Sequence, residues 1–161
     1  MNPFEHREII LTQGKVTVVD SRDYGTLAQY NWYAHRATCG RWDVMRNAGP
    51  GRKVYMHRQI LGMDDSDVRL VDHRNGDGLD NTRANLRFCT RQTNPMNRKI
   101  NQNNSSGYKG VFWDKSSGNW RAKIQVSRRQ INLGRFDKPE DAHAAYCEAA
   151  KLYHGEFART R

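Results

Sequence analysis

Residues 120–126, WRAKIQV, decide how the C-terminal part of this chain folds. Apolar and polar side chains alternate along them, which places one kind on each face of a β-strand. Residues 131–136, INLGRF, repeat the alternation, and residues 107–114, GYKGVFWD, are a third strand candidate before a turn at residues 116–118, SSG. We therefore predict a three-stranded antiparallel sheet with one apolar face and one face rich in hydrogen-bond donors.

Residues 137–156, DKPEDAHAAYCEAAKLYHGE, predict a helix of about four turns behind this sheet. Asp137 and Glu140 form a candidate N-cap pair, and Gly155 is expected to follow the last turn. An apolar stripe at helical spacing would cover the apolar face of the sheet, and its members are Ala142, Ala145, Tyr146, Ala149 and Tyr153.

The chain has 161 residues, of which 27 are Lys or Arg and 17 are Asp or Glu, so its formal net charge is +10. This length has room for one ordinary domain or two very small ones and excludes a large enzyme architecture. The charge is uneven, because residues 107–135 hold seven bases and one acid whereas residues 137–156 hold two bases and five acids. The polar face of the predicted sheet should therefore attract a polyanion, and nucleic acid is the leading class.

Membrane and disulfide classes are disfavoured. No segment approaches the roughly 20 consecutive apolar residues of a transmembrane helix. The first ten residues, MNPFEHREII, lack the basic and then apolar pattern of a signal peptide. Cys39, Cys89 and Cys147 are isolated, so neither a disulfide framework nor a structural zinc site is expected. We expect a cytoplasmic protein with no membrane partner.

The N-terminal part is predicted to be rich in β-structure. Residues 9–20, IILTQGKVTVVD, place β-branched runs on both sides of a Gln13-Gly14-Lys15 turn. Residues 42–47, WDVMRN, form a further strand candidate. Residues 54–62, VYMHRQILG, fit either a short helix or a strand that ends at Gly62.

Residues 71–94, VDHRNGDGLDNTRANLRFCTRQTN, combine an acid and an imidazole at Asp72 and His73 with amides at Asn85 and Asn94. Phosphodiester hydrolysis requires a base that activates water, a divalent cation that neutralises developing charge and a group that orients the base. A hard cation such as magnesium takes oxygen ligands, which carboxylates and amide carbonyls supply. Neighbouring side chains in a strand point to opposite sides, so Asp72 and His73 can act together only where the strand ends or where ion and water straddle the backbone.

This stretch resembles the phage-type HNH homing endonucleases, in which DH…N…N replaces the three letters of the name. The resemblance covers residues 54–98, from YMHR through DHRNGDGLDNTRANLR to TNPMNR. It implies a ββα unit around one metal ion and a metal-dependent DNA endonuclease that hydrolyses phosphodiester bonds, as a site-preferring nickase or a homing-type enzyme. His73 would be the general base, Asn85 would hold the loop that bears it, and Asp72 and Asn94 would ligate the ion. Asparagine as the third letter favours magnesium, with manganese as the alternative, and disfavours zinc.

Residues 107–157, with YKGV, WRAKI, LGRF and EDAHAAY, resemble the APETALA-type domain of plant ethylene-response factors. The resemblance implies a sheet that enters the major groove of double-stranded DNA, with a helix packed behind it. The DNA contacts that it carries over fall on Lys109, Gln125, Gln130 and Asn132, with Arg121 and Lys123 nearby. The plant domains typically have arginine at the positions of Phe112, Gln125 and Gln130. Their target sequence is therefore not transferred, since glutamine and asparagine favour adenine where arginine favours guanine.

The expected fold class is α+β, in four segments. A β-rich part at residues 1–53 leads into the HNH nuclease unit at residues 54–100. A polar linker, NQNNSS, follows at residues 101–106, and the APETALA-type DNA-binding domain spans residues 107–161. No small-molecule cofactor is expected beside the metal ion.

Two other functions stay open at this level. A non-catalytic DNA-binding regulator would use the C-terminal sheet and keep the DH…N…N stretch as a scaffold. A basic sheet with aromatic residues can also bind single-stranded RNA. His57 could contact substrate phosphate or pack in the interior. Four arginines beside the motif could hold the DNA backbone or be solvated, namely Arg74, Arg83, Arg87 and Arg91.

Overall fold

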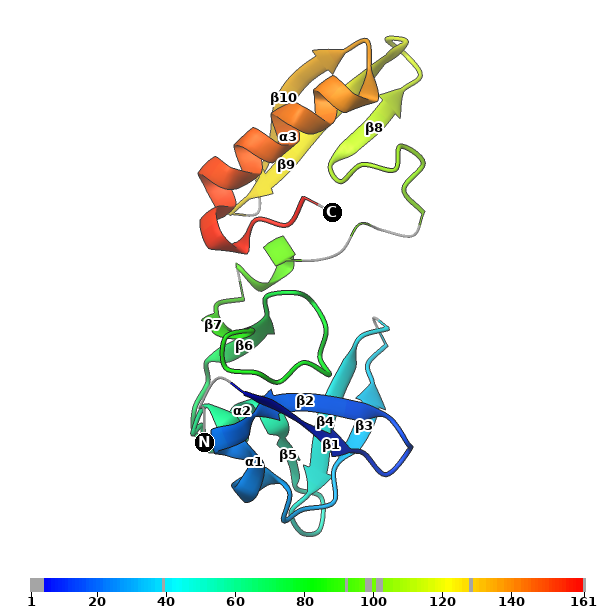
Figure 1. The fold of residues 1–161 in the computed structure, drawn as a ribbon. Coiled ribbons are helices and arrows are strands. Elements are labelled where there is room, and N and C mark those ends of the chain that lie inside the picture. Colours follow the sequence, from blue (N-terminus) through cyan, green and yellow to red (C-terminus); the bar gives the residue numbers. More distant parts are fainter. Residues whose placement is uncertain are drawn as a thin grey trace. The chain divides into compact units, whose positions relative to one another are not determined.

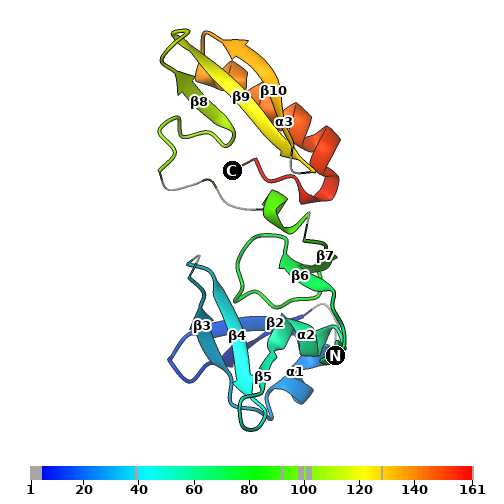
Figure 2. The ribbon, with the colours of Figure 1, turned by 180° about the vertical axis from the view of Figure 1, so that it is seen from behind.

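The computed structural model describes residues 5–38, 40–91, 93–97, 100, 103–127 and 129–160. The chain divides into two compact units, Met1–Cys89 and Thr90–Arg161. Figures 1 and 2 show the two units from opposite sides. In the described part of the chain, no helix is both long and apolar enough to cross a membrane.

The described residues of the N-terminal unit form small antiparallel sheets and two short helices (Figure 1). β1 pairs with β2, β4 lies between β3 and β5, and β6 pairs with β7. The bounds of these elements are β1 His6–Ile10, β2 Val16–Asp20, α1 Ser21–Leu27, β3 Tyr33–Arg36, β4 Trp42–Asn47, β5 Lys53–Tyr55, α2 Met56–Ile60, β6 Leu70–His73 and β7 Leu86–Cys89.

Most of the predicted N-terminal elements are confirmed. β1 and β2 pair antiparallel on either side of the Gln13-Gly14-Lys15 turn, and the strand predicted at residues 42–47 is β4. Residues 53–60 use both options that the sequence left open, because β5 runs directly into α2. Helix α1 was not predicted, since its sequence SRDYGTL is short, contains Gly25 and shows no apolar stripe.

One hydrophobic core of described residues holds the N-terminal unit together. Its buried side chains are Ile9, Leu11, Val19, Leu27, Trp32, Ala34, Val44, Met56, Ile60 and Leu86. Trp32 is 1% exposed, and its indole Nε1–H donates to the carbonyl of Leu27 at 2.8 Å. The β-rich start of the chain and the β6–β7 hairpin share this core, so burial of apolar surface ties the candidate nuclease residues to the first strands.

The C-terminal unit is a three-stranded antiparallel sheet of order β10-β9-β8 with helix α3 on one face (Figure 2). The predicted sheet and helix are confirmed. The bounds are η1 Asn94–Asn97, β8 Val111–Asp114, β9 Asn119–Val126, β10 Arg129–Phe136, α3 Pro139–His154 and η2 Gly155–Phe157. Two buried clusters join the sheet to the helix, and their fully packed members are Val111, Ala122, Ile124, Ala142, Tyr146, Ala149 and Ala150.

Two details of helix α3 differ from the prediction. Its N-cap is Lys138, because the residue before Pro139 is restricted to the extended conformation and the helix therefore begins at Pro139. Lysine has no acceptor, so no side-chain capping bond forms. The predicted apolar stripe is wrong at Tyr153, which is 44% exposed. The last turn instead buries His154, whose Nε2 lies 2.9 Å from the carbonyl oxygen of Gln125 on β9.

The polar stretch that precedes the C-terminal sheet is only partly described. Residues 101 and 102 of the predicted linker lie outside the described residues. Asn104 donates through Nδ2 to the carbonyl of Tyr108 at 3.0 Å, and the Ser106 hydroxyl lies within hydrogen-bond distance of the carbonyls of Tyr108 and Val111. Asn104 and Ser106 are therefore bonded to the start of the C-terminal sheet.

The fold class is thus mixed, with several small antiparallel sheets and one C-terminal helix. The β6–β7 hairpin supplies the first two elements of the expected ββα unit. The next element along the chain is the 3-10 helix η1, which belongs to the C-terminal unit, so a ββα-metal unit is not shown.

Candidate functional site

The β6–β7 hairpin positions two of the predicted site residues. Asp72 is paired in register with Arg87, and His73, the last residue of β6, is paired with Leu86. Because neighbouring side chains of a strand point to opposite faces, Asp72 and His73 enter different surroundings. Both are nevertheless buried, at 3% and 7% exposure.

Burial favours the neutral form of the His73 ring. Its Nε2 is 3.3 Å from Oδ1 of Asn81, and its ring meets the ring of His57 edge to face at a centroid distance of 5.4 Å. Burial lowers the pKa of His73 below its ordinary value, while the Asn81 hydrogen bond and the charge of Asp43 oppose that shift. A neutral imidazole is the form in which histidine accepts a proton, so this environment suits a general base.

His57 packs beside that ring. Burial lowers the pKa of His57 to about 3, with contributions from His73, Arg58 and Arg41. Its Nδ1 is buried and has no hydrogen-bond partner among the described residues, and its ring also lies 5.3 Å from the ring of Tyr55. Of the two roles left open by the sequence, the geometry favours packing.

Asn85 spans the loop that follows His73. Its Oδ1 accepts from the backbone N–H of Asn75 at 3.0 Å, and its Nδ2 donates to the carbonyl of Asp80 at 2.7 Å. The backbone carbonyl of Asn85 accepts from the N–H of Arg74 at 2.8 Å. One buried asparagine therefore ties both sides of the loop to the start of β7, which is the arrangement that its predicted role requires.

Asp72 is held by a buried ion pair. Arg87 donates from Nε at 2.9 Å and from one terminal nitrogen at 2.7 Å, both to Oδ2 of Asp72. The two side chains are 3% and 5% exposed. A guanidinium fork fixes the orientation of the carboxylate, so Asp72 is an oriented acid rather than a solvated one.

The loop between β6 and β7 is also anchored to the first strands. The N–H of Val18 on β2 donates to the carbonyl of Leu79, and the N–H of Asn81 donates to the carbonyl of Val18. Gly78 lies against β4 so closely that a Cβ there would collide with the carbonyl of Trp42. Sequence reasoning did not single out Asn81, because an amide in a turn-rich stretch is ordinarily read as a turn former.

Asn94, the other predicted metal ligand, lies in the C-terminal unit as the first residue of η1. Its backbone N–H donates to the carbonyl of Thr90 at 3.0 Å. The structure therefore places Asp72, His73 and Asn85 on one hairpin and its loop in the N-terminal unit and assigns Asn94 to the other unit.

The C-terminal sheet presents a polar face, which we define by the pairs Gln125 with Gln130, Lys123 with Asn132 and Arg121 with Arg135. Ala122 and Ile124 alternate with these residues and pack against α3, so the polar face is the one opposite the helix. Gln125, Gln130 and Asn132 are exposed. Five of the six predicted DNA-contacting residues thus share this face.

The two basic residues in the middle of that face have close neighbours from β8. Arg121 forms an ion pair with Asp114 at 2.8 Å, and the ammonium of Lys123 lies over the ring of Phe112 at 4.8 Å. These contacts orient two long side chains on the sheet. The exposed members of the polar face are Gln125, Gln130, Asn132 and Arg135.

Lys109 has a different position from the one expected. Its ammonium donates to the carbonyl of Met96 in η1 at 2.9 Å, and burial lowers its pKa to about 8. The reason is its place before β8, where the chain approaches η1 rather than the exposed face of the sheet.

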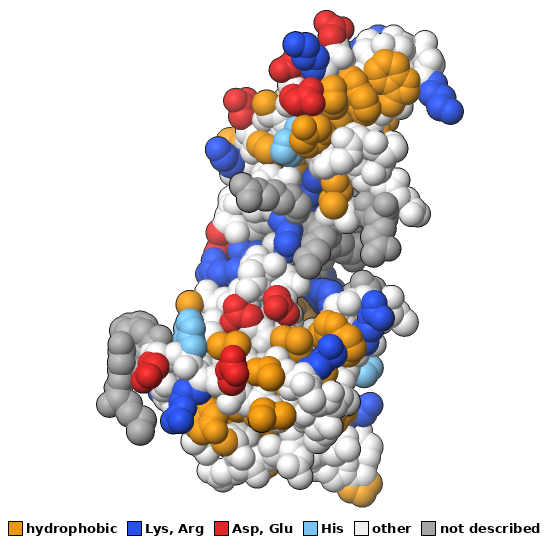
Figure 3. All heavy atoms as spheres, turned by 45° about the vertical axis from the view of Figure 1, so that its right-hand side comes forward, with side chains coloured by type: hydrophobic (Ala, Val, Ile, Leu, Met, Phe, Trp, Pro, Cys, Tyr) orange, Lys and Arg blue, Asp and Glu red, His pale blue; other side chains and the backbone are white. Residues whose placement is uncertain are grey.

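Several arginines of the N-terminal unit are engaged within the protein. Arg83 makes a two-pronged ion pair with Asp23 at 2.8 Å, and Arg87 pairs with Asp72. Figure 3 shows Lys and Arg side chains beside hydrophobic ones on the surface. The cation–aromatic pairs of this unit include Arg7 with Tyr24, Lys15 with Trp42, Arg46 with Tyr30 and Arg69 with Phe88.

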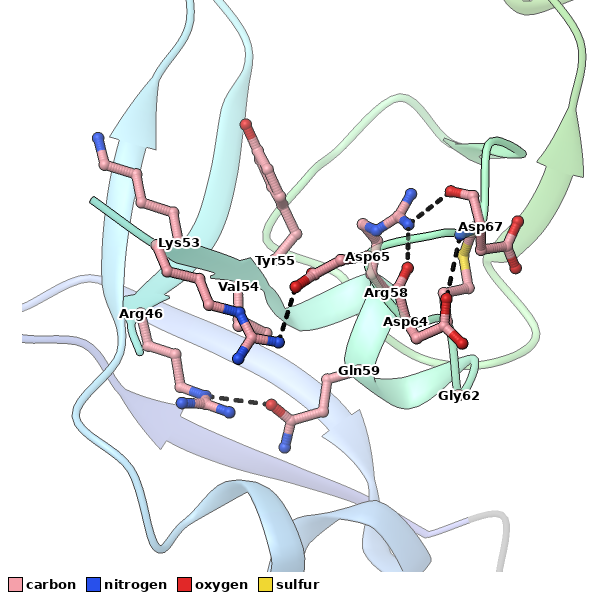
Figure 4. A pocket seen from close by; sticks show the side chains of 12 residues that line it. Arg46, Lys53, Val54, Tyr55, Arg58, Gln59, Gly62, Asp64, Asp65 and Asp67 are labelled. Atoms are coloured by element: carbon pink, nitrogen blue, oxygen red, sulfur yellow. Dashed lines mark hydrogen bonds and ion pairs between the residues drawn. The ribbon is translucent and has the colours of Figure 1, made fainter. Parts of the chain in front are cut away.

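A hollow beside α2 and β5, drawn in Figure 4, is lined by charged side chains, several of which are bonded within the protein. Arg52 pairs with Asp65 at 2.9 Å, and Arg58 donates to the carbonyls of Asp64 and Asp67. Arg46 donates to the Gln59 side chain. These contacts hold the loop after α2 in place. Because these side chains already have partners within the protein, the β6–β7 hairpin remains the candidate catalytic site.

Comparison with known proteins supports DNA binding. Residues 106–156 match the AP2 domain family, and an AP2 domain implies DNA binding. An ethylene-responsive transcription factor of Medicago truncatula is 33% identical over 84 residues, which are 51% of this chain and 31% of that protein. No solved structure gives a significant match.

Two viral proteins match larger parts of the chain. An uncharacterized HNH endonuclease of Acanthamoeba polyphaga mimivirus is 28% identical over 156 residues, which are 92% of this chain and 77% of that protein. Protein 3.8 of Escherichia phage T7 is 34% identical over 91 residues, which are 56% of this chain and 74% of that protein. The chain therefore belongs to the family of phage T7 Protein 3.8, and its residues 106–156 are an AP2 domain.

Proposed function

We propose that this protein is a metal-dependent DNA endonuclease that uses the β6–β7 hairpin to hydrolyse a phosphodiester bond and the C-terminal sheet to bind DNA. The observation that carries the proposal is the buried His73, held beside Asn81 at 3.3 Å at the end of β6. The similarity to the mimivirus HNH endonuclease, which extends over 92% of this chain, supports the same reaction class.

In the proposed reaction, His73 takes a proton from a water molecule, and the resulting hydroxide attacks phosphorus in line with the leaving 3′ oxygen. The leaving 3′ oxygen takes a proton from solvent, so the products carry 5′ phosphate and 3′ hydroxyl ends. Asn85 keeps the loop after His73 in place through Asn75 and Asp80, so the imidazole does not have to be ordered when DNA binds. One such site in a chain nicks one strand, and cutting both strands requires a second site.

The predicted ligands, Asp72 and Asn94, are of the type that suits a hard divalent ion. Asp72 offers a carboxylate that Arg87 orients, and ligating carboxylates are commonly hydrogen-bonded in this way. The described residues contain no group of three His, Cys, Asp or Glu side chains arranged for a metal, so further ligands would be amide and phosphate oxygens. Asp72 and Asn94 would hold magnesium or manganese, which when bound supplies charge stabilisation at the phosphate and the leaving oxygen.

The polar face of the C-terminal sheet would read the DNA. Gln125, Gln130 and Asn132 are exposed amides, which favour adenine edges in the major groove, and Lys123 and Arg121 add phosphate affinity. Recognition by these groups would give the nuclease a preferred site rather than a random one.

A supercoiled plasmid tests the proposal. With magnesium, the protein is expected to produce nicked circles, and chelator or His73→Ala should abolish them while DNA affinity is retained. His35→Ala is the matched control, because His35 is an exposed histidine on β3 of the same unit. Cleavage that persists in His73→Ala would contradict the assignment of the base.

One observation favours a second candidate, a non-catalytic DNA-binding regulator. The carboxylate of Asp72 is already paired with a buried guanidinium, as expected of a structural ion pair. This candidate predicts duplex binding with no magnesium-dependent nicking under any condition of the plasmid assay.

A further inference from the structure

The hydrogen bonds around Asn81 leave its amide one orientation. Its Nδ2 donates to Oγ1 of Thr17 at 3.0 Å and to the carbonyl of Gly78 at 3.1 Å, which uses both amide protons. A carbonyl only accepts, so turning the amide over would set two acceptors, Asn81 Oδ1 and the Gly78 carbonyl, against each other. The side chain is fully buried, which makes an unpaired acceptor costly.

Thr17 fixes the arrangement from the other side. Its hydroxyl donates to the carbonyl of Leu79 at 2.7 Å, so its oxygen can only accept from Asn81. Thr17, Asn81 and His73 are thus linked by a series of hydrogen bonds. The backbone carbonyls of Leu79 and Gly78, which can only accept, set the direction of each bond in that series. Thr17 lies on β2, and its neighbour Val18 bonds to the backbone of both Leu79 and Asn81.

The acceptor that remains, Oδ1 of Asn81, faces His73. Since an amide oxygen cannot donate, the contact of 3.3 Å requires the proton on Nε2 of His73. In a neutral imidazole with a proton on Nε2, the lone pair that accepts a proton is on Nδ1.

We propose that Asn81, oriented by Thr17, is a positioning residue that holds His73 in the tautomer protonated at Nε2 and so makes Nδ1 the basic atom of the nuclease. The catalytic consequence rests on the proposed function, whereas the tautomer itself does not. Strand β2 then has a part in catalysis although it supplies no group that touches DNA or water.

Two variants of equal size separate positioning from mere support of the loop. Asn81→Leu and Asn81→Asp both lose the two donated hydrogen bonds. Only the aspartate keeps an acceptor opposite Nε2, while it also places an oxygen against the carbonyl of Gly78. If Asn81 only supports the loop, kcat of Asn81→Asp should equal that of Asn81→Leu or be lower. If Asn81 positions His73, kcat of Asn81→Asp should be higher than that of Asn81→Leu.

The first readout is kinetic. For Asn81→Leu we expect kcat for plasmid nicking to fall about 100-fold, within the roughly 10²- to 10⁴-fold that a general base contributes, with DNA affinity unchanged. Asn81→Asp should retain at least about 10-fold more kcat than Asn81→Leu, because it keeps the proton on Nε2. Equal kcat values for the two variants would overturn the proposal.

The second readout needs no nuclease activity. Nitrogen NMR of the histidine rings in the full chain, with His73→Ala for assignment, reports which ring nitrogen carries the proton. The wild-type protein should show His73 protonated at Nε2, and Asn81→Leu should show a mixture of tautomers. A proton on Nδ1 in the wild type would overturn the inference, whereas absence of nicking with the expected NMR result would contradict the proposed function alone.

Thr17 provides a milder test if the Asn81 variants do not fold. Thr17→Val removes the hydroxyl that accepts the hydrogen bond from Asn81, and Thr17→Ser keeps it. The valine variant should lower kcat and mix the tautomers, and the serine variant should restore both. Identical behaviour of the two variants would count against the role of Thr17 and of the amide that it orients.

Discussion

The two units use the same kinds of side chain in opposite ways. In the β6–β7 hairpin, Asp72, His73 and Arg87 are buried. Asp72 is paired with Arg87, and His73 lies within hydrogen-bond distance of Asn81 in the loop. On the C-terminal sheet, Gln125 and Asn132 are exposed. Buried amides and arginines in the first unit therefore hold a structure in place, and the exposed amides of the second are available for a ligand.

This contrast teaches that residue type alone does not assign a role. Burial without a partner is costly for a polar group, so a buried network must be complete before it can position anything. An exposed amide has water as its partner and exchanges it for a base edge at little cost. Substitutions in the first unit should thus change stability, and substitutions on the sheet should change DNA binding.

The largest expected effect is on the buried ion pair. Arg87→Met should lower the free energy of unfolding by about 3–5 kcal/mol, because it leaves the Asp72 carboxylate buried and uncompensated. Denaturant unfolding measures this. Arg121→Met is the matched control, since its partner Asp114 lies on the C-terminal sheet, and its loss of stability should be much smaller. Equal losses would break the contrast between the units.

The next effect is on sequence preference. Gln125→Ala should reduce discrimination at one base pair by about 1–3 kcal/mol, as expected for loss of an amide that reads adenine, while thermal stability is unchanged. Selection from a randomised duplex library measures the preference. Asn85→Ala, which removes a buried amide, should do the reverse and lower stability. A loss of stability in Gln125→Ala would show that Gln125 stabilises the fold and would contradict its assignment as an exposed DNA-reading residue.

A smaller effect concerns pH. The pKa of His57 is about 3 in the folded protein against an ordinary value of 6.5, so below about pH 6.5 the unfolded chain binds a proton that the folded protein does not. Protonation then favours unfolding, and the free energy of unfolding should fall by about 1 kcal/mol per pH unit from pH 6.5 toward pH 3. Denaturant unfolding at several pH values measures this slope, which should be shallower in His57→Phe. An unchanged slope in that variant would show that the buried ring does not titrate as expected.

The smallest effect is on the salt dependence of DNA binding. Lys123→Gln should reduce the slope of log affinity against log salt by about 0.9, the loss of one phosphate contact. Lys109→Gln should leave the slope unchanged, because its ammonium is bonded to the carbonyl of Met96. Equal changes in slope would return Lys109 to the DNA-contacting set.

The C-terminal fold could be predicted because its pattern is local. Alternation along residues 120–126 and 131–136 separates the two faces of the sheet, and helical spacing along residues 139–154 supplies the cover. The predictions that were wrong concern the two ends of helix α3. The N-cap depends on backbone restriction before Pro139, and the burial of His154 instead of Tyr153 depends on where the helix meets β9.

The candidate site was predictable only in part. The sequence singled out Asp72, His73 and Asn85 through their spacing, and the structure places them in one hairpin and its loop. The sequence did not reveal the roles of Asn81 and Thr17, whose contact joins residues 64 positions apart. Pairing at that distance follows from the packing of β2 beside the loop, which no local pattern reports.

The amino-acid sequence by itself determined the basic, alternating strands of the C-terminal sheet, the helix behind them and the acid, imidazole and amide types of the nuclease-like stretch. These follow from periodicity and residue chemistry, which are properties of short segments. Only the tertiary structure decided which of the polar side chains are buried, that Arg87 neutralises Asp72, that Lys109 faces η1, and that Thr17 and Asn81 direct the proton of His73. Burial and hydrogen-bond direction depend on what surrounds a group in space, so they arise when distant segments pack together.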